Sequence, residues 1–130
     1  MPQSSPVTIL VVDDDLDHLN IVRLKLEAHP FKVITAKDGT EALRLIREHL
    51  PSLIILDVMI PKLSGFKVAR LLKFDAKVKQ IPLILLTART QEVDRTLGLE
   101  VGADAYITKP FDPEFLMKEV KRLLATEQSA

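Results

Sequence analysis

Short apolar runs of strand length alternate with longer segments of helical periodicity along almost the whole chain. The expected strands lie at 7–12, 31–35, 52–57, 81–87 and 104–108, and the expected helices at 15–28, 39–48, 64–74, 91–101 and 112–125. Strict alternation of this kind predicts an α/β fold built on a parallel sheet. The first, third and fourth strands are apolar almost throughout, which is typical of strands that helices cover on both faces. The second and fifth are more mixed, which suits the edges of the sheet.

The length and composition fit one ordinary globular domain. With 130 residues, of which 47% are hydrophobic and 28% charged, the chain can bury a sizeable core without disulfides or metals as staples. We expect this domain over residues 7–125, with flexible ends at 1–6 and 126–130. No internal repeat or second domain is evident.

The charge balance and the absence of cysteine exclude several classes of protein. Eighteen basic residues match eighteen acidic ones, so no net positive field attracts nucleic acid or an anionic membrane. Without cysteine there are no disulfides and no thiolate metal sites, which fits a reducing cytoplasm. The start has no secretory pattern, and the longest apolar runs are shorter than the ~20 residues that span a bilayer. We therefore expect a soluble cytoplasmic protein.

Capping residues mark several of the expected helix ends. Asp38 followed by Glu41 forms a capping-box start for the second helix. Ser64 and Asp112 are N-cap candidates for the third and fifth helices. Gly102 can close the fourth helix in the left-handed conformation.

Acidic residues follow two of the buried strands at the point where each strand ends. Asp57 closes the apolar run at 53–56, and Asp13 and Asp14 follow the run at 7–12. Neighbouring parallel strands bring such tips together, and several anions crowded at one place are unfavourable unless a cation joins them. The pattern predicts a hard divalent metal beside an aspartate that can act as a nucleophile.

Each acid also has a plainer interpretation. Asp15 is expected to cap the following helix, and its neighbours favour the positive helix end. Asp57 taken alone could be an ordinary turn residue. However, three consecutive acids exceed what capping requires. The loop after Asp57 contains Pro61 and Gly65, which favour turns, and it is suited to expose the end of the strand.

A hydroxyl and a cation end two further strands. Thr87 ends the fourth strand, where its hydroxyl could bond an added oxyanion, although a strand threonine is usually only a good β former. Lys109 ends the fifth strand and could pair with a phosphate, although a lone lysine is usually solvated. The Lys109–Pro110 bond is a candidate for the cis isomer. Because open α/β sheets bind ligands at the carboxyl edge, we expect all these groups to form one site.

Together these residues resemble the receiver domain of two-component response regulators, over about residues 7–125. The resemblance rests on short motifs in the family's order and spacing: Val11-Val12-Asp13-Asp14, Leu56-Asp57-Val58-Met59-Ile60-Pro61 with Gly65, Thr87-Ala88, and Tyr106 with Lys109-Pro110. The family fold is a flavodoxin-like, doubly wound sheet of five parallel strands in the order 2-1-3-4-5, with five helices.

The resemblance implies a role for each acidic residue. Asp57 would accept a phosphoryl group from a histidine kinase or a histidine phosphotransfer protein. Asp14, Asp57 and the Met59 carbonyl would hold Mg²⁺, with Mn²⁺ as a substitute, and Asp13 would act partly through water. The chain would then be a signalling switch that takes part in its own phosphotransfer, and not a turnover enzyme.

The resemblance also implies a switch. Thr87 would bond the phosphoryl group and Lys109 would pair with it. Tyr106, otherwise an ordinary edge-strand aromatic, would rotate inward behind Thr87. The surface that changes would be the fourth helix, the fifth strand and the fifth helix.

Two positions near the site predict a long phosphoryl lifetime. Met59 lies two residues after Asp57, and Arg89 lies two residues after Thr87. Neither side chain is a carboxylate or an amide that could readily orient an attacking water. We therefore expect slow loss of the phosphoryl group.

Three other function classes compete with this interpretation. A phosphohydrolase with an aspartyl intermediate would need a further acid or base and a substrate lid. A flavin-binding protein would need a phosphate loop after the first strand, where this chain has acids that repel phosphate. A phosphorylation-independent interaction domain would not need the complete set of site residues.

Several other features have no role in that site. His18, His29 and His49 have no metal-ligand or nucleophile pairing in the sequence, so we expect them on helix surfaces or ends. Lys73, Lys77 and Lys79 form a basic segment, either solvated or in contact with a partner. No DNA-binding domain follows the fifth helix, which suits a stand-alone receiver or a part of a larger regulator, as a monomer or a phosphorylation-dependent dimer.

Overall fold

The computed structural model describes residues 7–88 and 102–129. In chain order its elements are β1 (Val7–Val12), α1 (Leu16–Glu27), β2 (Phe31–Ala36), α2 (Gly39–His49), β3 (Leu53–Asp57), α3 (Gly65–Lys73), β4 (Leu83–Ala88), β5 (Ala105–Lys109) and α5 (Pro113–Ser129). The helix expected at 91–101 lies outside the described residues, as does Arg89.

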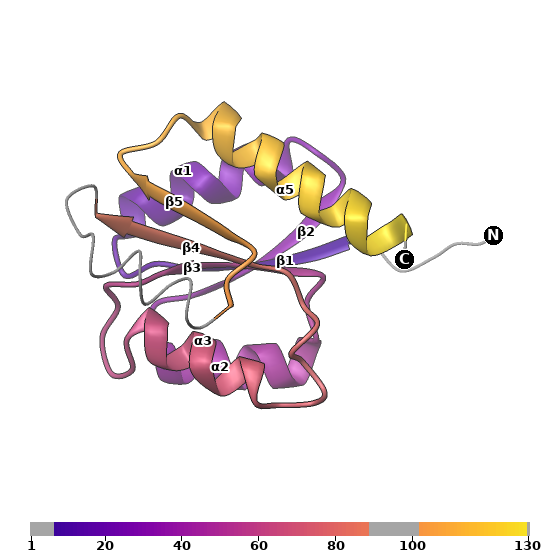
Figure 1. Cartoon of the computed structure of the whole chain (residues 1–130). Helices are drawn as coiled ribbons and strands as arrows, with labels where there is room; N and C mark the ends of the chain where they lie inside the picture. The colour runs from indigo at the N-terminus through magenta and orange to yellow at the C-terminus, as the bar shows by residue number, and fades with distance from the viewer. Residues whose placement is uncertain (1–6, 89–101, 130) are drawn as a thin grey trace.

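The five strands form one parallel sheet in the order β2-β1-β3-β4-β5, which confirms the predicted topology. β3 lies at the centre, between β1 and β4. The register pairs Val12 with Leu56 and Asp57 with Leu86, so these strands end near the same level. Their carboxyl ends therefore share one edge of the sheet (Figure 1).

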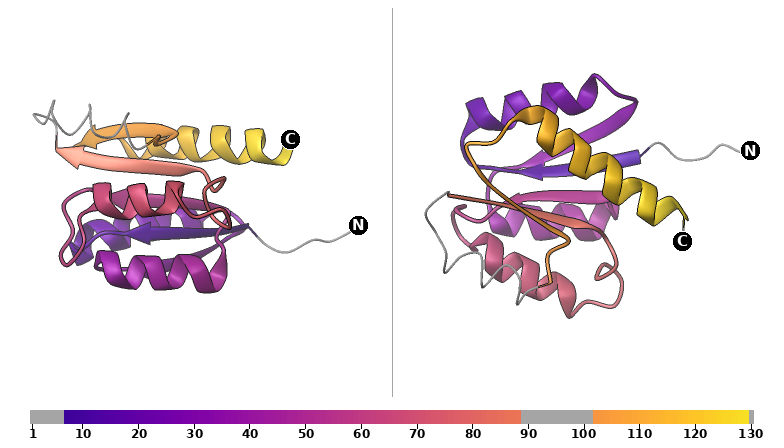
Figure 2. Two further views of the ribbon diagram at one scale, coloured as in Figure 1. Left: turned by 60° about the horizontal axis from the view of Figure 1, so that its bottom comes forward. Right: turned by 45° about the horizontal axis from the view of Figure 1, so that its top comes forward.

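Helices cover both faces of the sheet, as Figures 1 and 2 show. α1 and α5 pack on one face against strand residues such as Ile9 and Ile55. α2 and α3 pack on the other face against their chain neighbours Leu10 and Ile54. Because successive strand residues point to opposite faces, a strand covered on both sides must be apolar at each position. This explains the unbroken apolar runs of the three inner strands.

Side-chain caps begin the helices at the predicted residues. Asp15, Asp38 and Ser64 each accept hydrogen bonds from backbone N–H groups in the first turn of α1, α2 and α3. Asp112 Oδ1 accepts from the N–H of the second residue of α5 at 2.9 Å. Gly102 has a φ of 77°, the left-handed conformation expected of it.

Two boundaries differ by more than one residue from the predicted ones. β4 begins at Leu83 and not at residue 81, because Pro82 has no N–H to donate to the ladder. α5 continues to Ser129, beyond the predicted end at residue 125, and takes in most of the segment assigned to a flexible tail. Within the described ranges, no helix combines the length and apolarity that a membrane crossing requires.

Candidate functional site

Charged side chains from three strand ends meet at the carboxyl edge of the sheet. Asp57 is the last residue of β3, Lys109 is the last residue of β5, and Asp13 and Asp14 follow β1 directly. One carboxylate oxygen from each of Asp13, Asp14 and Asp57 lies within 4.8 Å of the other two. The parallel topology thus brings together, from different strand ends, residues that are 43 or more positions apart in the sequence.

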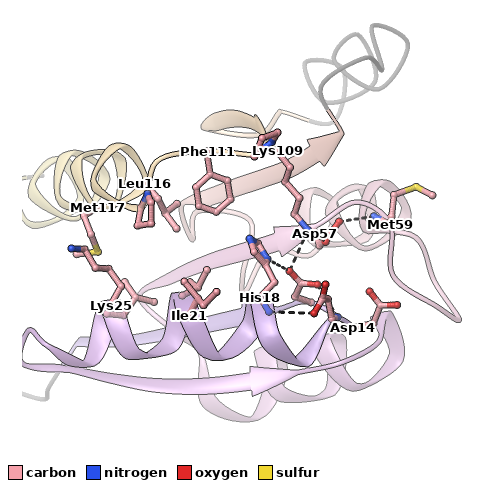
Figure 3. A pocket seen from close by; sticks show the side chains of 16 residues that line it. Asp14, His18, Ile21, Lys25, Asp57, Met59, Lys109, Phe111, Leu116 and Met117 are labelled. Carbon is pink, nitrogen blue, oxygen red and sulfur yellow. Dashed lines mark hydrogen bonds and ion pairs between the residues drawn. The ribbon is translucent and has the colours of Figure 1, made fainter.

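Lys109 connects the two buried carboxylates of this cluster. Its Nζ lies 3.3 Å from Asp13 Oδ2 and donates a second hydrogen bond to Asp57 Oδ2 (Figure 3). Asp13 is 1% exposed and Asp57 is 4% exposed, so neither charge is well solvated. A paired ammonium group is what makes such burial tolerable. The Lys109–Pro110 peptide bond is cis, as the X–Pro sequence permits.

The loop between β3 and α3 holds Asp57 in place. The Met59 N–H donates to Asp57 Oδ1 at 2.9 Å, and the Gly65 N–H donates to the Val58 carbonyl at 2.9 Å. A Cβ added to Gly65 would lie 2.5 Å from the Asp57 carbonyl oxygen, so only glycine allows α3 to start this close to β3. The Met59 side chain is 69% exposed and points away from the carboxylates (Figure 3).

Burial and neighbouring charges shift the pKa values of the site. Burial raises the pKa of Asp57 above its ordinary value, and the Asp13 charge adds to the rise, although the hydrogen bond from Lys109 opposes it. Burial acts the same way on Asp13, yet hydrogen bonds from His18 and a backbone N–H hold its pKa below the ordinary value. Burial disfavours the Lys109 ammonium, but its two carboxylate partners raise its pKa. Three carboxylates therefore share one lysine ammonium at this edge of the sheet, and the site favours a further cation.

The structure corrects the prediction for His18. Its Nδ1–H donates to Asp13 Oδ2, the same oxygen that Lys109 approaches, and its ring meets Phe111 edge-on with centroids 5.4 Å apart. His18 therefore lies at a helix end, as expected, but it has a partner beside the site that the sequence did not predict. The other two histidines lie at helix ends, as expected: His29 lies just after α1, and His49 lies in the last turn of α2.

Thr87 and Tyr106 lie on the adjacent strands β4 and β5. Thr87 is buried near the end of β4, in register with Thr108 of β5. Tyr106 is half-buried and packs against the cluster between the sheet and α2 and α3, with its hydroxyl oxygen buried. The ring already lies inward in this structure, and the rotation expected on activation stays a prediction.

A cavity of about 730 Å³ extends from the carboxylates into the space between α1 and α5 (Figure 3). Asp57 and Lys109 line one end, and apolar side chains such as Ile21, Leu116 and Met117 line the rest. Asp57 therefore faces free space on this side despite its low exposure. A reacting group can approach it from the α1 and α5 side.

The acidic cluster fits a hard divalent cation. Its three ligand candidates, Asp13, Asp14 and Asp57, offer carboxylate oxygens only. Mg²⁺ and Mn²⁺ prefer oxygen ligands, whereas the softer transition metals favour thiolate or imidazole.

Comparison with known proteins agrees with this geometry. A family model of the response regulator receiver domain matches residues 9–121. The chain belongs to the response regulator receiver domain family. This receiver domain is 43% identical over 122 residues to the alkaline phosphatase synthesis transcriptional regulatory protein PhoP of Bacillus subtilis, which covers 94% of the chain and 50% of PhoP. It spans about half the length of the curated relatives it matches.

Solved structures share the fold of this receiver domain. The chemotaxis response regulator CheY4 of Vibrio cholerae is 32% identical, with a TM-score of 0.84 over 92% of this chain and 99% of that one. The receiver domain of a sensor histidine kinase from Pseudomonas aeruginosa is 26% identical, with a TM-score of 0.85 over 93% and 99%. That protein was crystallised with a magnesium ion coordinated in its active site cleft.

Proposed function

We propose that this receiver domain is a phosphorylation-controlled switch in which Asp57 accepts a phosphoryl group. The observation that carries the proposal is the position of Lys109, whose ammonium group joins Asp57 and Asp13 at the mouth of a cavity. A cation held there is placed to bind the oxygens of an incoming phosphoryl group. Membership of the receiver family and the acidic trio at one sheet edge support the same assignment.

In the proposed reaction a carboxylate oxygen of Asp57 attacks the phosphorus of a phosphohistidine. The new O–P bond forms as the P–N bond breaks, and the electron pair of that bond returns to the imidazole nitrogen of the donor. Lys109 leaves Asp57 Oδ2 and pairs with a phosphoryl oxygen, and its raised pKa keeps it protonated for this role. The Met59 N–H keeps Asp57 Oδ1 oriented during the transfer.

Asp14 and Asp57, with the Met59 carbonyl, would hold Mg²⁺ or Mn²⁺, and Asp13 would act partly through water. Bound there, the metal would offset the repulsion between carboxylate and phosphoryl oxygens and draw charge from the latter. The oxygen-only donor set supports this choice of metal. His18 fixes the carboxylate of Asp13 from the α1 side.

We propose that the Thr87 hydroxyl bonds the transferred group and transmits its presence along β4. Phosphorylation adds negative charge and strong acceptors at one point, which favours movement of a nearby donor. Tyr106 responds, and the surface of the fourth helix, β5 and α5 changes. Hydrogen exchange over residues 88–108 before and after phosphorylation tests this switch, and equal exchange in both states would contradict it.

The proposed phosphodonor is a histidine kinase or a histidine phosphotransfer protein, in the cytoplasm. The cavity beside Asp57 supports an approach from the α1 and α5 side. The relatives PhoP and MtrA are a transcriptional regulatory protein and a DNA-binding response regulator, and this chain matches about half the length of each.

Intact-mass analysis tests the phosphoacceptor. The chain is incubated with acetyl phosphate, with Mg²⁺ and with EDTA in its place. We expect one phosphoryl adduct that requires Mg²⁺ and is lost in Asp57→Asn, while Asp17→Asn on the exposed side of α1 keeps it. An adduct that persists in Asp57→Asn would contradict the assignment.

A further inference from the structure

Positive charge is concentrated in one part of a chain whose total charge is balanced. Residues 62–80 contain six basic residues and one acidic residue, whereas the whole chain has eighteen of each. This segment forms α3 and the loop after it. The acidic residue, Asp75, is already engaged, because its carboxylate lies 3.7 Å from Arg47 Nε of α2.

The charged groups of four of these cations make no ion pair or hydrogen bond within the part of the chain that the structure describes. Lys67, Arg70, Lys77 and Lys79 are exposed, and no carboxylate of residues 7–88 and 102–125 lies within 4.0 Å of their charged groups. The remaining two basic residues of the segment are engaged: Lys62 pairs with Asp38 at 3.6 Å, and Lys73 Nζ donates to the Lys79 carbonyl at 3.3 Å.

Exposed apolar side chains lie among the free cations. Phe74, the C-cap of α3, is 86% exposed, and Leu71 is 41% exposed. The spacing of Lys67, Arg70, Leu71 and Phe74 places them along one side of the helix, while Val68, Ala69 and Leu72 on the other side are buried. We call the exposed set of Lys67, Arg70, Leu71, Phe74, Lys77 and Lys79 the α3 face.

We propose that the α3 face is a docking surface for an acidic protein segment that carries an apolar side chain. An aromatic anchor among charged residues is the usual arrangement of an energetic centre in a protein interface. Here the anchor is Phe74, and the surrounding cations would steer and orient glutamate or aspartate side chains of the partner. Charge complementarity therefore requires an acidic partner. The exposed phenyl ring of Phe74 requires that this partner also offer an apolar side chain for contact.

A protein partner fits the α3 face better than a membrane or a nucleic acid. The inner side of α3 is packed on the sheet, so a membrane would meet one narrow row with one phenylalanine and one leucine, too little for interfacial insertion. The four cations of the α3 face, on a chain of zero net charge, could neutralise only a few phosphates of a nucleic acid, and its affinity would be low. Burial of Phe74 and Leu71 together with neutralised charge is instead what a protein surface provides.

The α3 face is separate from the cavity beside Asp57. α3 lies with α2 on one face of the sheet (Figure 1). The cavity is lined by residues of α1 and α5, which cover the other face. A partner on α3 and a phosphodonor in the cavity could therefore bind together. The N-terminus of α3 nevertheless touches the Asp57 backbone through Gly65, so docking and phosphorylation share one loop.

The test uses the full chain, labelled with ¹⁵N, and a synthetic helical peptide of glutamates with leucines along one side. We expect amide shifts confined to α3 and the loop after it, and salt-sensitive binding. The double charge reversal Lys67→Glu with Arg70→Glu should weaken binding at least about tenfold, which is 1.4 kcal/mol. Phe74→Ser should also weaken it, as should a peptide with serines in place of leucines, whereas Lys32→Glu on β2 should not.

All variants must retain the thermal unfolding temperature and the acetyl phosphate labelling of the parent chain. We expect this because the changed side chains are exposed. Shifts outside α3 and the loop after it, or unchanged binding after charge reversal, would overturn the proposal. So would tighter binding of phosphatidylserine vesicles or of oligo(dT) than of the peptide, since either would identify a different class of partner.

Discussion

Lys109 Nζ donates a hydrogen bond to Asp57 Oδ2 and so joins the ends of β5 and β3 across the intervening strand β4. The two residues are 52 positions apart in the sequence. The contact sets a cation beside the proposed nucleophile, with Asp13 as its second partner. In the free protein it offsets the repulsion of two buried carboxylates, and in the proposed reaction it is available to the phosphoryl oxygens.

Removal of the ammonium group should therefore slow the phosphorylation of Asp57. For Lys109→Ala we expect a rate with acetyl phosphate lower by about 10²-fold, the effect of removing one preorganised charged donor. The rate is measured by intact mass over time. Lys118→Ala, which removes an exposed lysine of α5, is the control and should react like the parent chain. Equal rates for Lys109→Ala and its control would contradict the role of Lys109.

Mg²⁺ should stabilise the fold, because it binds the native arrangement of carboxylates and not the unfolded chain. A concentration 100 times the Kd would add about 2.7 kcal/mol to the free energy of unfolding. Thermal unfolding with and without Mg²⁺ measures the gain. Asp14→Asn should lose most of it, while Asp17→Asn should keep it. Equal gains in both variants would place the metal elsewhere.

The sheet and its site were predictable because both follow from strand order. Asp57, Asp13 and Lys109 each stand at the end of an apolar run, and parallel topology alone brings such ends to one edge. The contact of His18 with Asp13 was not predictable, because it depends on the rotation of α1 about its axis and on the position of Phe111 after β5. The start of β4 was missed by two residues, since Pro82 looked like part of an apolar run.

Gly65 should be irreplaceable, because its backbone lies against the end of β3. In Gly65→Ala the added Cβ would lie 2.5 Å from the Asp57 carbonyl oxygen and 2.6 Å from Val58 Cα, and neither backbone atom can move without displacing the strand end. We expect a loss of about 1–3 kcal/mol in the free energy of unfolding, as for other overpacked sites. Urea unfolding measures it. Lys67→Ala, on the exposed side of the same helix, should change stability by less than about 0.5 kcal/mol.

Asp38 should contribute a pH-dependent part of the stability. The hydrogen bond from the Glu41 N–H, aided by the charge of Lys62, holds the pKa of Asp38 below its ordinary value of 3.8. Its stabilisation is therefore present above the unfolded pKa and is lost as the pH falls through the folded one. Asp38→Asn keeps a capping side chain but not the charge, so it should be less stable than the parent at neutral pH. The gap should close in acid, and a gap independent of pH would contradict the assignment.

The phosphoryl lifetime should depend on two positions near Asp57. Met59 has an exposed side chain beside the site, and Arg89, outside the described residues, lies two residues after Thr87. We expect the double variant Met59→Asn with Arg89→Glu to shorten the half-life of the adduct by up to about 10²-fold. The introduced amide and carboxylate can orient an attacking water, which the native side chains cannot readily do. Intact-mass decay curves measure it. An unchanged half-life would remove the role assigned to these positions.

A crystal structure of the protein with Mg²⁺ and beryllofluoride tests the proposed chemistry most directly, because beryllofluoride mimics a phosphoryl group on a carboxylate. We expect beryllium bonded to an Asp57 carboxylate oxygen, Lys109 Nζ and the Thr87 hydroxyl on fluorine atoms, and the metal held by Asp14, Asp57 and the Met59 carbonyl. A structure in which Lys109 still bridges Asp57 and Asp13, with neither metal nor beryllofluoride bound, would contradict the proposed function.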